Sequence, residues 1–333
     1  MDVTFLGVSG YLIRWGSHSL LTGPLFTRIS LRGVIGNTDA VVDTGFIDAK
    51  LGAGELHDAM SEVDGILIGH SHYDHLMDVP YIAHTYARQA TIYGTPTMGH
   101  ILAGDSSLGP ACSSSGVPPN SSKGPDGCRV VVIDSADVGS GSRNGTWMYV
   151  RRAGESAAAP ARFRVMALRS AHARNFLWYT LAPGMLHADL EALPRRVQGW
   201  KLGESYAYLI DLIRPDSSVA FRLYYMDAVG APPSGFPPPL VHDGGTVVTV
   251  ALMCAGNFEQ VEDYPGDILS RVHPKSVLLG HWENFFSPQS DAPKAIPAMR
   301  ARELADRMDE AMPDSRGWIT PEPFSTFHFC NCR

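Results

Sequence analysis

One hexapeptide constrains the fold of this chain more than any other feature of its sequence. Residues 70–75 read His-Ser-His-Tyr-Asp-His, so four side chains of kinds that bind metal ions lie within six positions. The preceding run at 65–69, Gly-Ile-Leu-Ile-Gly, is typical of a β-strand that is covered on both faces. A buried strand that ends in such side chains predicts a metal site at the edge of a layered α/β protein.

The spacing within the hexapeptide favours two neighbouring metal positions. Alternate side chains of an extended segment point the same way, so His70 and His72 can face one metal ion. Asp74 and His75 follow on the turn and can face a neighbouring point. Neither pair completes a four-coordinate shell, so further ligands must come from distant parts of the chain.

Three distant residues are candidates for the remaining ligands, namely His172, Asp227 and His281. Each stands where a predicted strand meets a loop, which is where α/β proteins assemble their sites. Each alone is consistent with a structural or surface role, but the three together with the hexapeptide favour a shared site. The other histidines lack this context, and we interpret them as structural or surface residues: His18, His57, His84, His100, His187, His242, His273 and His328.

Charge and hydropathy limit the partners of the chain. Its 333 residues include 27 Lys and Arg against 34 Asp and Glu, and no basic stripe exists to neutralise a nucleic acid. No stretch reaches the roughly 18 consecutive apolar residues of a membrane-spanning helix. The sequence does not open on a basic region followed by a long apolar segment, so we expect a cytoplasmic protein. We expect its partner to be a small-molecule substrate. The oligomeric state stays open.

Apolar runs and turn signals predict alternating strands and helices in one α/β domain that spans residues 1–333. The predicted strands are residues 3–6, 11–14, 19–21, 65–69, 130–133, 164–168, 206–210, 220–225, 247–253 and 276–279. One helix is predicted after Asp78, its N-cap, and others at 265–272 and 297–312. Two segments interrupt the pattern, a long mobile insertion at about 105–127 and a proline-rich loop at 231–239.

The cysteines give no sign of a disulfide scaffold, because there are only five of them. Cys112 and Cys128 bracket a flexible segment and would bridge in an oxidising compartment, although free or buried thiols are the simpler interpretation. No Cys-x-x-Cys pair occurs, so we do not expect a zinc site made of thiolates.

The hexapeptide, the distant ligand candidates and the Gly-His-Trp at 280–282 resemble the metallo-β-lactamase-fold hydrolases. Residues 5–13 and 20–26 also resemble the first strands of that family, and the resemblance covers most of the chain. The nearest branches are the ascorbate-phosphate lactonase-like and the N-acylphosphatidylethanolamine phospholipase D-like proteins. The resemblance implies a four-layer αβ/βα sandwich with two mixed β-sheets and a dinuclear metal site along one edge.

The resemblance also implies which residues hold each ion. The first metal would be bound by His70, His72 and His172, the second by Asp74, His75 and His281, with Asp227 bridging the two. Ligation by imidazole and carboxylate alone suits zinc, with manganese or iron as alternatives. An aspartate at 227, rather than a thiolate, resembles the glyoxalase II and lactonase type more than the zinc β-lactamases.

This ligand set leads us to expect a hydrolase. Two divalent ions about 3.5–4 Å apart can share a water and lower its pKa to near 7, and Asp74 is then the catalytic residue that steers or accepts the proton. Ester or lactone bonds are the expected substrates, and phosphodiesters are the alternative. A β-lactamase and a dinuclear-iron redox protein rank lower, the latter because it normally needs a flavin partner.

Residues next to the ligand candidates suggest the walls of the substrate pocket. Aromatic side chains beyond metal ligands often line a cleft, and an arginine can pair with an anionic group. The candidate substrate-binding residues are Tyr73, Arg174, Trp178, Phe236 and Trp282. One position departs from the family, because Gly23 stands where relatives carry an aspartate that supports the metals. Asp43 or Asp48 could take over that role.

Overall fold

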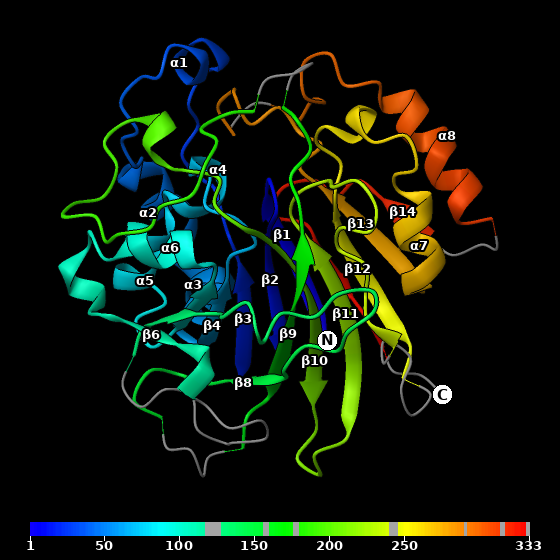
Figure 1. Cartoon of the computed structure of the whole chain (residues 1–333), viewed down its shortest axis with the longest axis horizontal. Helices are drawn as coiled ribbons and strands as arrows, with labels where there is room; N and C mark the ends of the chain where they lie inside the picture. The colour runs from blue at the N-terminus through cyan, green and yellow to red at the C-terminus, as the bar shows by residue number, and fades with distance from the viewer. Residues whose placement is uncertain are drawn as a thin grey trace.

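Two β-sheets lie face to face at the centre of the molecule, and helices cover their outer faces (Figure 1). The computed structural model describes residues 1–116, 128–155, 160–175, 180–239, 246–289, 292–313 and 317–330. Most of the insertion that we predicted to be mobile, residues 117–127, lies outside this part of the chain. Within the described residues, no helix has the length and the apolar character that a membrane span requires.

The first sheet is mixed and contains eight strands in the order β15-β1-β2-β3-β4-β5-β7-β6. Its strands are β1 (Asp2–Gly7), β2 (Gly10–Trp15), β3 (His18–Thr22), β4 (Val63–Leu67), β5 (Thr91–Gly94), β6 (Ala111–Ser113), β7 (Val130–Val132) and β15 (Thr326–His328). The pairs from β15 to β3 are antiparallel, and those from β3 to β6 are parallel.

The second sheet is also mixed and contains seven strands in the order β14-β13-β12-β11-β10-β9-β8. Its strands are β8 (Met148–Val150), β9 (Phe163–Ser170), β10 (Ser205–Ile213), β11 (Val219–Met226), β12 (Val248–Cys254), β13 (Ser276–Gly280) and β14 (Gly317–Ile319). The pairs from β8 to β11 are antiparallel, and those from β11 to β14 are parallel.

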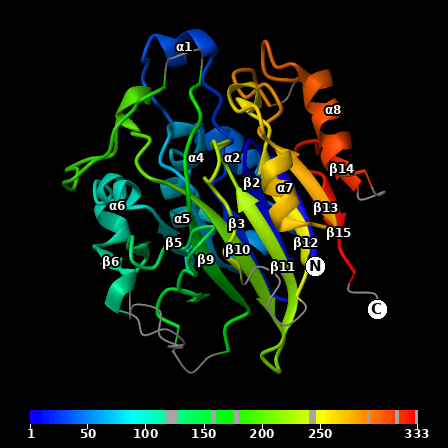
Figure 2. The same ribbon diagram turned by 45° about the vertical axis from the view of Figure 1, so that its right-hand side comes forward.

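Three apolar layers hold these elements together. The middle layer fills the space between the two sheets and receives side chains from both. One outer layer packs the first sheet against α1 (Leu31–Ile35), α2 (Thr44–Leu51), α3 (Gly54–Ser61), α4 (Tyr73–Leu76), α5 (Val79–Thr85) and α6 (Pro96–Leu102). The other packs the second sheet against α7 (Gly266–Val272) and α8 (Ala301–Ala311), which lie on its outer face (Figure 2). The predicted four-layer arrangement with two mixed sheets is therefore confirmed.

Short 3₁₀ helices connect several of these elements: η1 (Ser106–Leu108), η2 (Ser114–Gly116), η3 (Val197–Gly199) and η5 (Phe258–Gln260). Among the predicted boundaries that differ from the structure, two have clear local reasons. The helix predicted from residue 297 begins only at Ala301, because Ala298 has a φ of +69°, which a right-handed helix does not allow. The strand predicted at 65–69 ends at Leu67, after which the chain turns toward the hexapeptide.

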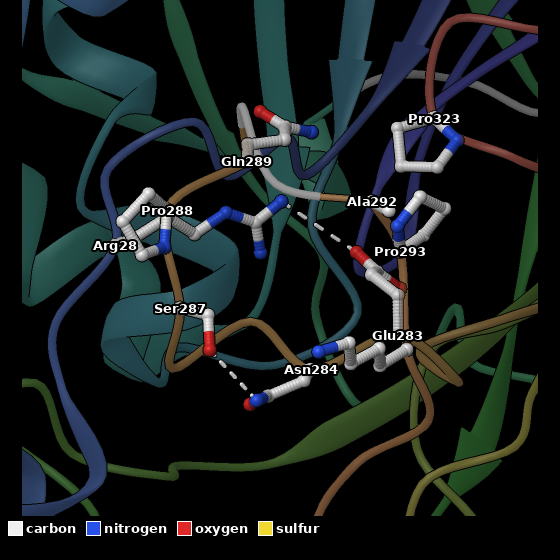
Figure 3. Close-up of a pocket in the computed structure, with 10 residues that line it drawn as sticks. Arg28, Glu283, Asn284, Ser287, Pro288, Gln289, Ala292, Pro293 and Pro323 are labelled. Atoms are coloured by element: carbon white, nitrogen blue, oxygen red, sulfur yellow. Dashed lines mark hydrogen bonds and ion pairs between the residues drawn. The ribbon is translucent and has the colours of Figure 1, made fainter.

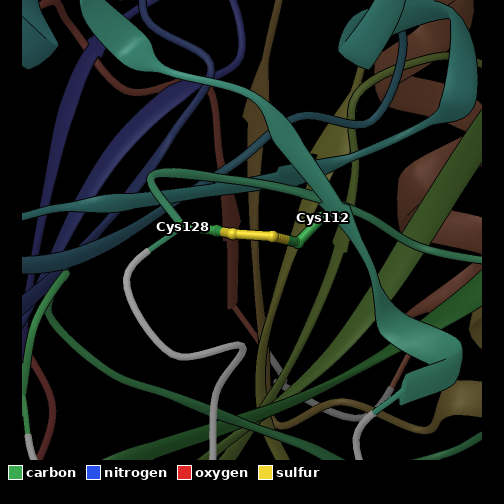
Figure 4. The surroundings of a disulfide bond; sticks show 2 residues. All are labelled: Cys112 and Cys128. Carbon is green, nitrogen blue, oxygen red and sulfur yellow. A yellow bond between two sulfur atoms is a disulfide. The ribbon is translucent and has the colours of Figure 1, made fainter.

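A disulfide joins Cys112 on β6 to Cys128, which precedes β7 (Figure 4). The two Cα atoms are 6.1 Å apart, and 16 positions separate the cysteines in the sequence. The strands that carry or follow them pair in parallel at the edge of the first sheet. The bond therefore joins β6 to the residue two positions before β7 at the edge of the sheet.

Loss of this disulfide is expected to lower the free energy of unfolding by about 3 kcal/mol, because it closes a loop of roughly 15 residues in the unfolded chain. Urea unfolding of the Cys112→Ser/Cys128→Ser double variant measures the effect. Cys330→Ser, which changes an exposed free thiol, is the matched control. An unchanged free energy of unfolding in the double variant would contradict the expectation.

Candidate metal centre

All seven predicted ligands lie at one edge of the two sheets. The hexapeptide follows β4 in the first sheet and runs into α4. The distant candidates follow strands of the second sheet: His172 after β9, Asp227 after β11 and His281 after β13. The backbone N–H of Tyr206 on β10 donates to the carbonyl of Gly69 at 2.8 Å and so ties the two sheets together at this edge.

The glycine before the hexapeptide makes this approach possible. A Cβ atom at Gly69 would lie 2.3 Å from Oδ2 of Asp227, a distance that real Cβ contacts do not show. Only glycine lets the carboxylate from the second sheet reach the histidines of the first.

Three histidines form the first group of candidate ligands. One ring nitrogen each of His70, His72 and His172 lies within 4.8 Å of the others. The Nε2 of His72 donates to the carbonyl of Leu181 at 2.8 Å, which leaves Nδ1 as the nitrogen with a free lone pair. His172 donates from Nδ1 to the carbonyl of Ala173, so its Nε2 is free. These two carbonyls orient the imidazoles in the way that partners of metal-bound histidines do.

Asp74, His75 and His281 form the second group, again with ligand atoms within 4.8 Å of one another. Oδ2 of Asp74 is 3.6 Å from Nε2 of His75 and 3.4 Å from Nε2 of His281. Asp227 lies between the groups, with Oδ1 3.1 Å from Nδ1 of His70 and Oδ2 3.7 Å from Nδ1 of His75. Asp227 therefore lies within reach of both groups.

Many ring nitrogens and carboxylate oxygens of these seven residues are buried without a hydrogen-bond partner among the described residues. They are Nε2 of His70, both ring nitrogens of His75, Nδ1 of His281 and Oδ2 of Asp227. An unsatisfied buried polar atom costs about 1–3 kcal/mol, so such atoms seldom collect in one place without a ligand. A set of imidazoles and carboxylates with free lone pairs fits divalent transition metals.

Burial and neighbouring imidazoles place three of the histidines and Asp74 in the protonation states that metal binding requires. Burial lowers the pKa of His70, His72 and His75 well below the usual value, so these imidazoles are neutral at pH 7. Burial raises the pKa of Asp74, but the imidazoles of His75 and His281 outweigh it and hold that pKa well below the usual range. For Asp227, burial dominates and raises the pKa.

Two residues that the sequence did not single out, Val8 and Glu283, hold His281 in position through hydrogen bonds. His281 has a φ of +57° and Val8 one of +54°, both unfavourable for side chains with a Cβ. The N–H of His281 donates to the carbonyl of Val8, whose own N–H donates to Oε1 of Glu283 at 2.6 Å. Arg28 pairs with the same oxygen at 3.6 Å. The position of Glu283, two residues after His281, was the only signal in the sequence.

Glu283→Ala is expected to weaken binding at the His281 side of the site by about 10–100-fold, as loss of a partner that orients a ligand typically does. Titration with Co²⁺, followed by its absorption spectrum, separates the two sites. Glu283→Gln keeps an acceptor for the Val8 N–H and should restore most of the affinity. An equal loss of metal affinity in both variants would show that the hydrogen bond between Val8 and Glu283 does not position His281.

Four of the five predicted substrate-binding residues lie in the part of the chain that the structure describes. Tyr73 is buried on α4, with a hydroxyl that has no partner among the described residues. Arg174 is exposed, and Trp178 lies outside the described residues. Phe236 is only 6% exposed and lies under the guanidinium of Arg271, so little of its ring is open to a substrate.

Trp282 packs against the outer core cluster and donates from Nε1 to the carbonyl of Pro321 at 2.8 Å. Phe285, by contrast, contacts the site directly, because its ring centroid is 4.8 Å from that of His281. The substrate-binding roles proposed from the sequence remain predictions.

The position of Gly23 has a steric reason. A Cβ atom there would lie 2.5 Å from the backbone oxygen of His75, so an aspartate does not fit without a shift of the hexapeptide. Asp43 uses its carboxylate to cap α2 through the N–H of Phe46. Asp48 accepts hydrogen bonds from the hydroxyls of Tyr81 and Tyr86. Both carboxylates are thus engaged away from the candidate ligands.

Comparison with solved structures gives matches along nearly the whole chain. The isothiocyanate hydrolase from Delia radicum gut bacteria matches with a TM-score of 0.51 at 12% identity, and the match covers 99% of each chain. Igni18, a metallo hydrolase from the archaeon Ignicoccus hospitalis, matches with a TM-score of 0.49 at 13% identity and 99% coverage of each chain. The metallo-β-lactamase fold protein YhfI from Bacillus subtilis matches at 0.46 and 11% identity, over 98% of this chain and 99% of that one.

These likenesses concern the fold, because the identities are low. No protein-family model matches the sequence. A search of curated protein sequences gave no match either. The chemistry of the site therefore has to be argued from its own residues.

Proposed function

This chain has the metallo-β-lactamase fold, and on that premise we propose that it is a metal-dependent hydrolase with a dinuclear site. The observation that carries the proposal is the set of buried nitrogen and oxygen atoms without partners, contributed by residues from both sheets. Because both sheets supply ligands, we also propose that residues 1–333 act as one catalytic domain.

In this proposal each ligand group holds one divalent ion. His70, His72 and His172 bind the first, and Asp74, His75 and His281 bind the second, with Asp227 between them. Zinc is the first choice, with manganese or iron as alternatives. When bound, such ions supply an activated water and polarise the scissile bond.

Asp74 is the proposed proton acceptor of the reaction. Its carboxylate is held ionised by neighbouring imidazoles, and the residue is 7% exposed. The buried Asp227 is 1% exposed. We assign proton transfer to Asp74 and the bridging of the ions to Asp227, whose oxygens lie 3.1 Å from Nδ1 of His70 and 3.7 Å from Nδ1 of His75.

Ester or lactone hydrolysis is the proposed reaction, and phosphodiester hydrolysis is the second candidate. An aspartate at 227 in place of a thiolate favours the lactonase type, and both kinds of bond suit attack by an activated water. The fold alone does not decide between them, because one fold hosts many reactions.

A parallel screen tests the proposal. Metal-loaded enzyme is assayed on aryl esters, lactones, thioesters, aryl phosphodiesters and β-lactams, each with and without a chelator. We expect hydrolysis of esters or lactones that the chelator suppresses and added Zn²⁺ restores. Failure on every substrate, or activity that a chelator leaves unchanged, would refute the proposal.

A further inference from the structure

A pocket with a volume of about 60 Å³ opens beside the loop that follows His281 (Figure 3). Its lining includes Arg28 from the segment after β3, and Glu283, Gln289 and Lys294 from the loop. The side chains of Arg28 and Glu283 are 7% and 5% exposed and form its floor, while Lys294 is exposed at its rim. The pocket thus leads from solvent to a buried guanidinium.

The guanidinium of Arg28 has no hydrogen bond to any residue that the structure describes. Its Nε, Nη1 and Nη2 are all buried without a partner. Figure 3 shows it pointing toward the carboxylate of Glu283, but Nη2 and Oε1 are 3.6 Å apart, beyond hydrogen-bond distance. Burial lowers the pKa of Arg28 even though Glu283 and Asp78 oppose this, so the two carboxylates do not fully compensate the buried charge.

The neighbouring groups are fixed in place and leave these donors free. Oε1 of Glu283 accepts from the N–H of Val8 at 2.6 Å, and Nε2 of Gln289 donates to the carbonyl of Leu6 at 2.8 Å. A Cβ atom at Gly7 would lie 2.8 Å from Nη2 of Arg28, so glycine keeps this space open. Two basic side chains line the pocket against one acidic one, and Asp78, the other carboxylate that acts on Arg28, lies outside the lining. The lining itself therefore favours a negatively charged ligand.

We propose that this pocket binds a small oxyanion, a carboxylate or a phosphate group, on the guanidinium of Arg28. The planar fork of an arginine matches two oxygens of such a group. The oxyanion belongs either to the substrate or to a free ion. The first of these sources rests on the proposed function, because Glu283 on the pocket floor lies only two residues from His281.

Inorganic phosphate is the probe for the pocket. Its binding is measured by calorimetry on the intact chain, both metal-loaded and after chelation, so that binding to metal ions is separated from binding to Arg28. We expect one phosphate per chain after chelation and an affinity that falls by at least about tenfold in Arg28→Gln. Arg32→Gln, which changes an exposed arginine on α1, should leave the affinity unchanged.

Two further variants keep the test decisive if Arg28→Gln does not fold. Lys294→Gln changes an exposed side chain and should weaken phosphate binding by about threefold, as a rim charge would. Glu283→Gln removes the acidic side chain of the lining and should tighten binding. The pocket is not an oxyanion site if phosphate fails to bind after chelation, or if these variants bind it as the parent chain does.

A pair of matched aryl esters, one neutral and one with a carboxylate, identifies the source of the oxyanion. If the oxyanion belongs to the substrate, Arg28→Gln slows only the charged ester, and phosphate competes with it alone. If the site takes a free ion, phosphate alters the hydrolysis of both esters alike. Phosphate binding to the chelated chain does not depend on turnover. The oxyanion site can therefore be refuted while the hydrolase proposal stands, and the hydrolase proposal can be refuted while the oxyanion site stands.

Discussion

His72→Ala is expected to abolish hydrolysis while the chain stays folded. The imidazole is one of three in the first ligand group, and its Nδ1 is the nitrogen left free for an ion. Loss of a partner that only supports a ligand costs about 10–100-fold, so loss of a ligand itself should cost more than about 1000-fold in turnover. The measurement is kcat of the metal-loaded variant, with circular dichroism as a check on folding.

His57→Ala is the matched control for this variant. His57 lies on α3, its side chain is 48% exposed, and it is remote from the ligand groups in the sequence and in its contacts. It should retain full activity. A His72→Ala enzyme that keeps more than about a tenth of the parent activity would mean that the first group does not carry the chemistry.

Gly69→Ala is expected to lower turnover nearly as much as His72→Ala does, although it replaces no candidate ligand. The new methyl group would lie 2.3 Å from Oδ2 and 2.4 Å from Oδ1 of Asp227. Asp227 cannot move aside cheaply, because it is 1% exposed and Oδ1 is only 3.1 Å from Nδ1 of His70. We expect activity to fall by more than about 100-fold, along with the number of ions bound.

Gly266→Ala is the control for Gly69→Ala. Gly266 is the first residue of α7, and a Cβ atom there would meet nothing within 4 Å. Metal content by elemental analysis and kcat are compared in the two variants. If Gly69→Ala binds as much metal as Gly266→Ala, the carboxylate of Asp227 is not needed between the two groups.

The clustering of the candidate ligands was predictable from the sequence because the densest part of its signal is local. A dense run of metal-binding side chains directly after a buried strand strongly favours a metal site, and each distant candidate also stands at the end of an apolar strand. Since parallel strands of one sheet end at the same edge, sequence position brings Asp227 and His281 together, and the packing of the two sheets brings them near the hexapeptide.

Arg28 and Glu283 were not predictable for the opposite reason. In the sequence each is an isolated charge, which is usually a solvated surface residue. They become a buried pair only because the turn at Val8, the segment after β3 and the loop after His281 meet in space. The surroundings of Phe236 were not predictable from the sequence either. Its closeness to Asp227 in the sequence suggested the substrate pocket, but its ring lies under Arg271 in the apolar layer outside the second sheet.

The metal content of the purified chain is the most direct test of the proposed dinuclear site. The purified chain is loaded with Zn²⁺, freed of excess ion by gel filtration and analysed for metal per chain, and its hydrolytic activity is followed during chelation. We expect about two ions per chain, with activity that disappears as they are removed and returns when they are added back. A chain that binds no divalent ion, or that hydrolyses its substrate at full rate after exhaustive chelation, would contradict the account.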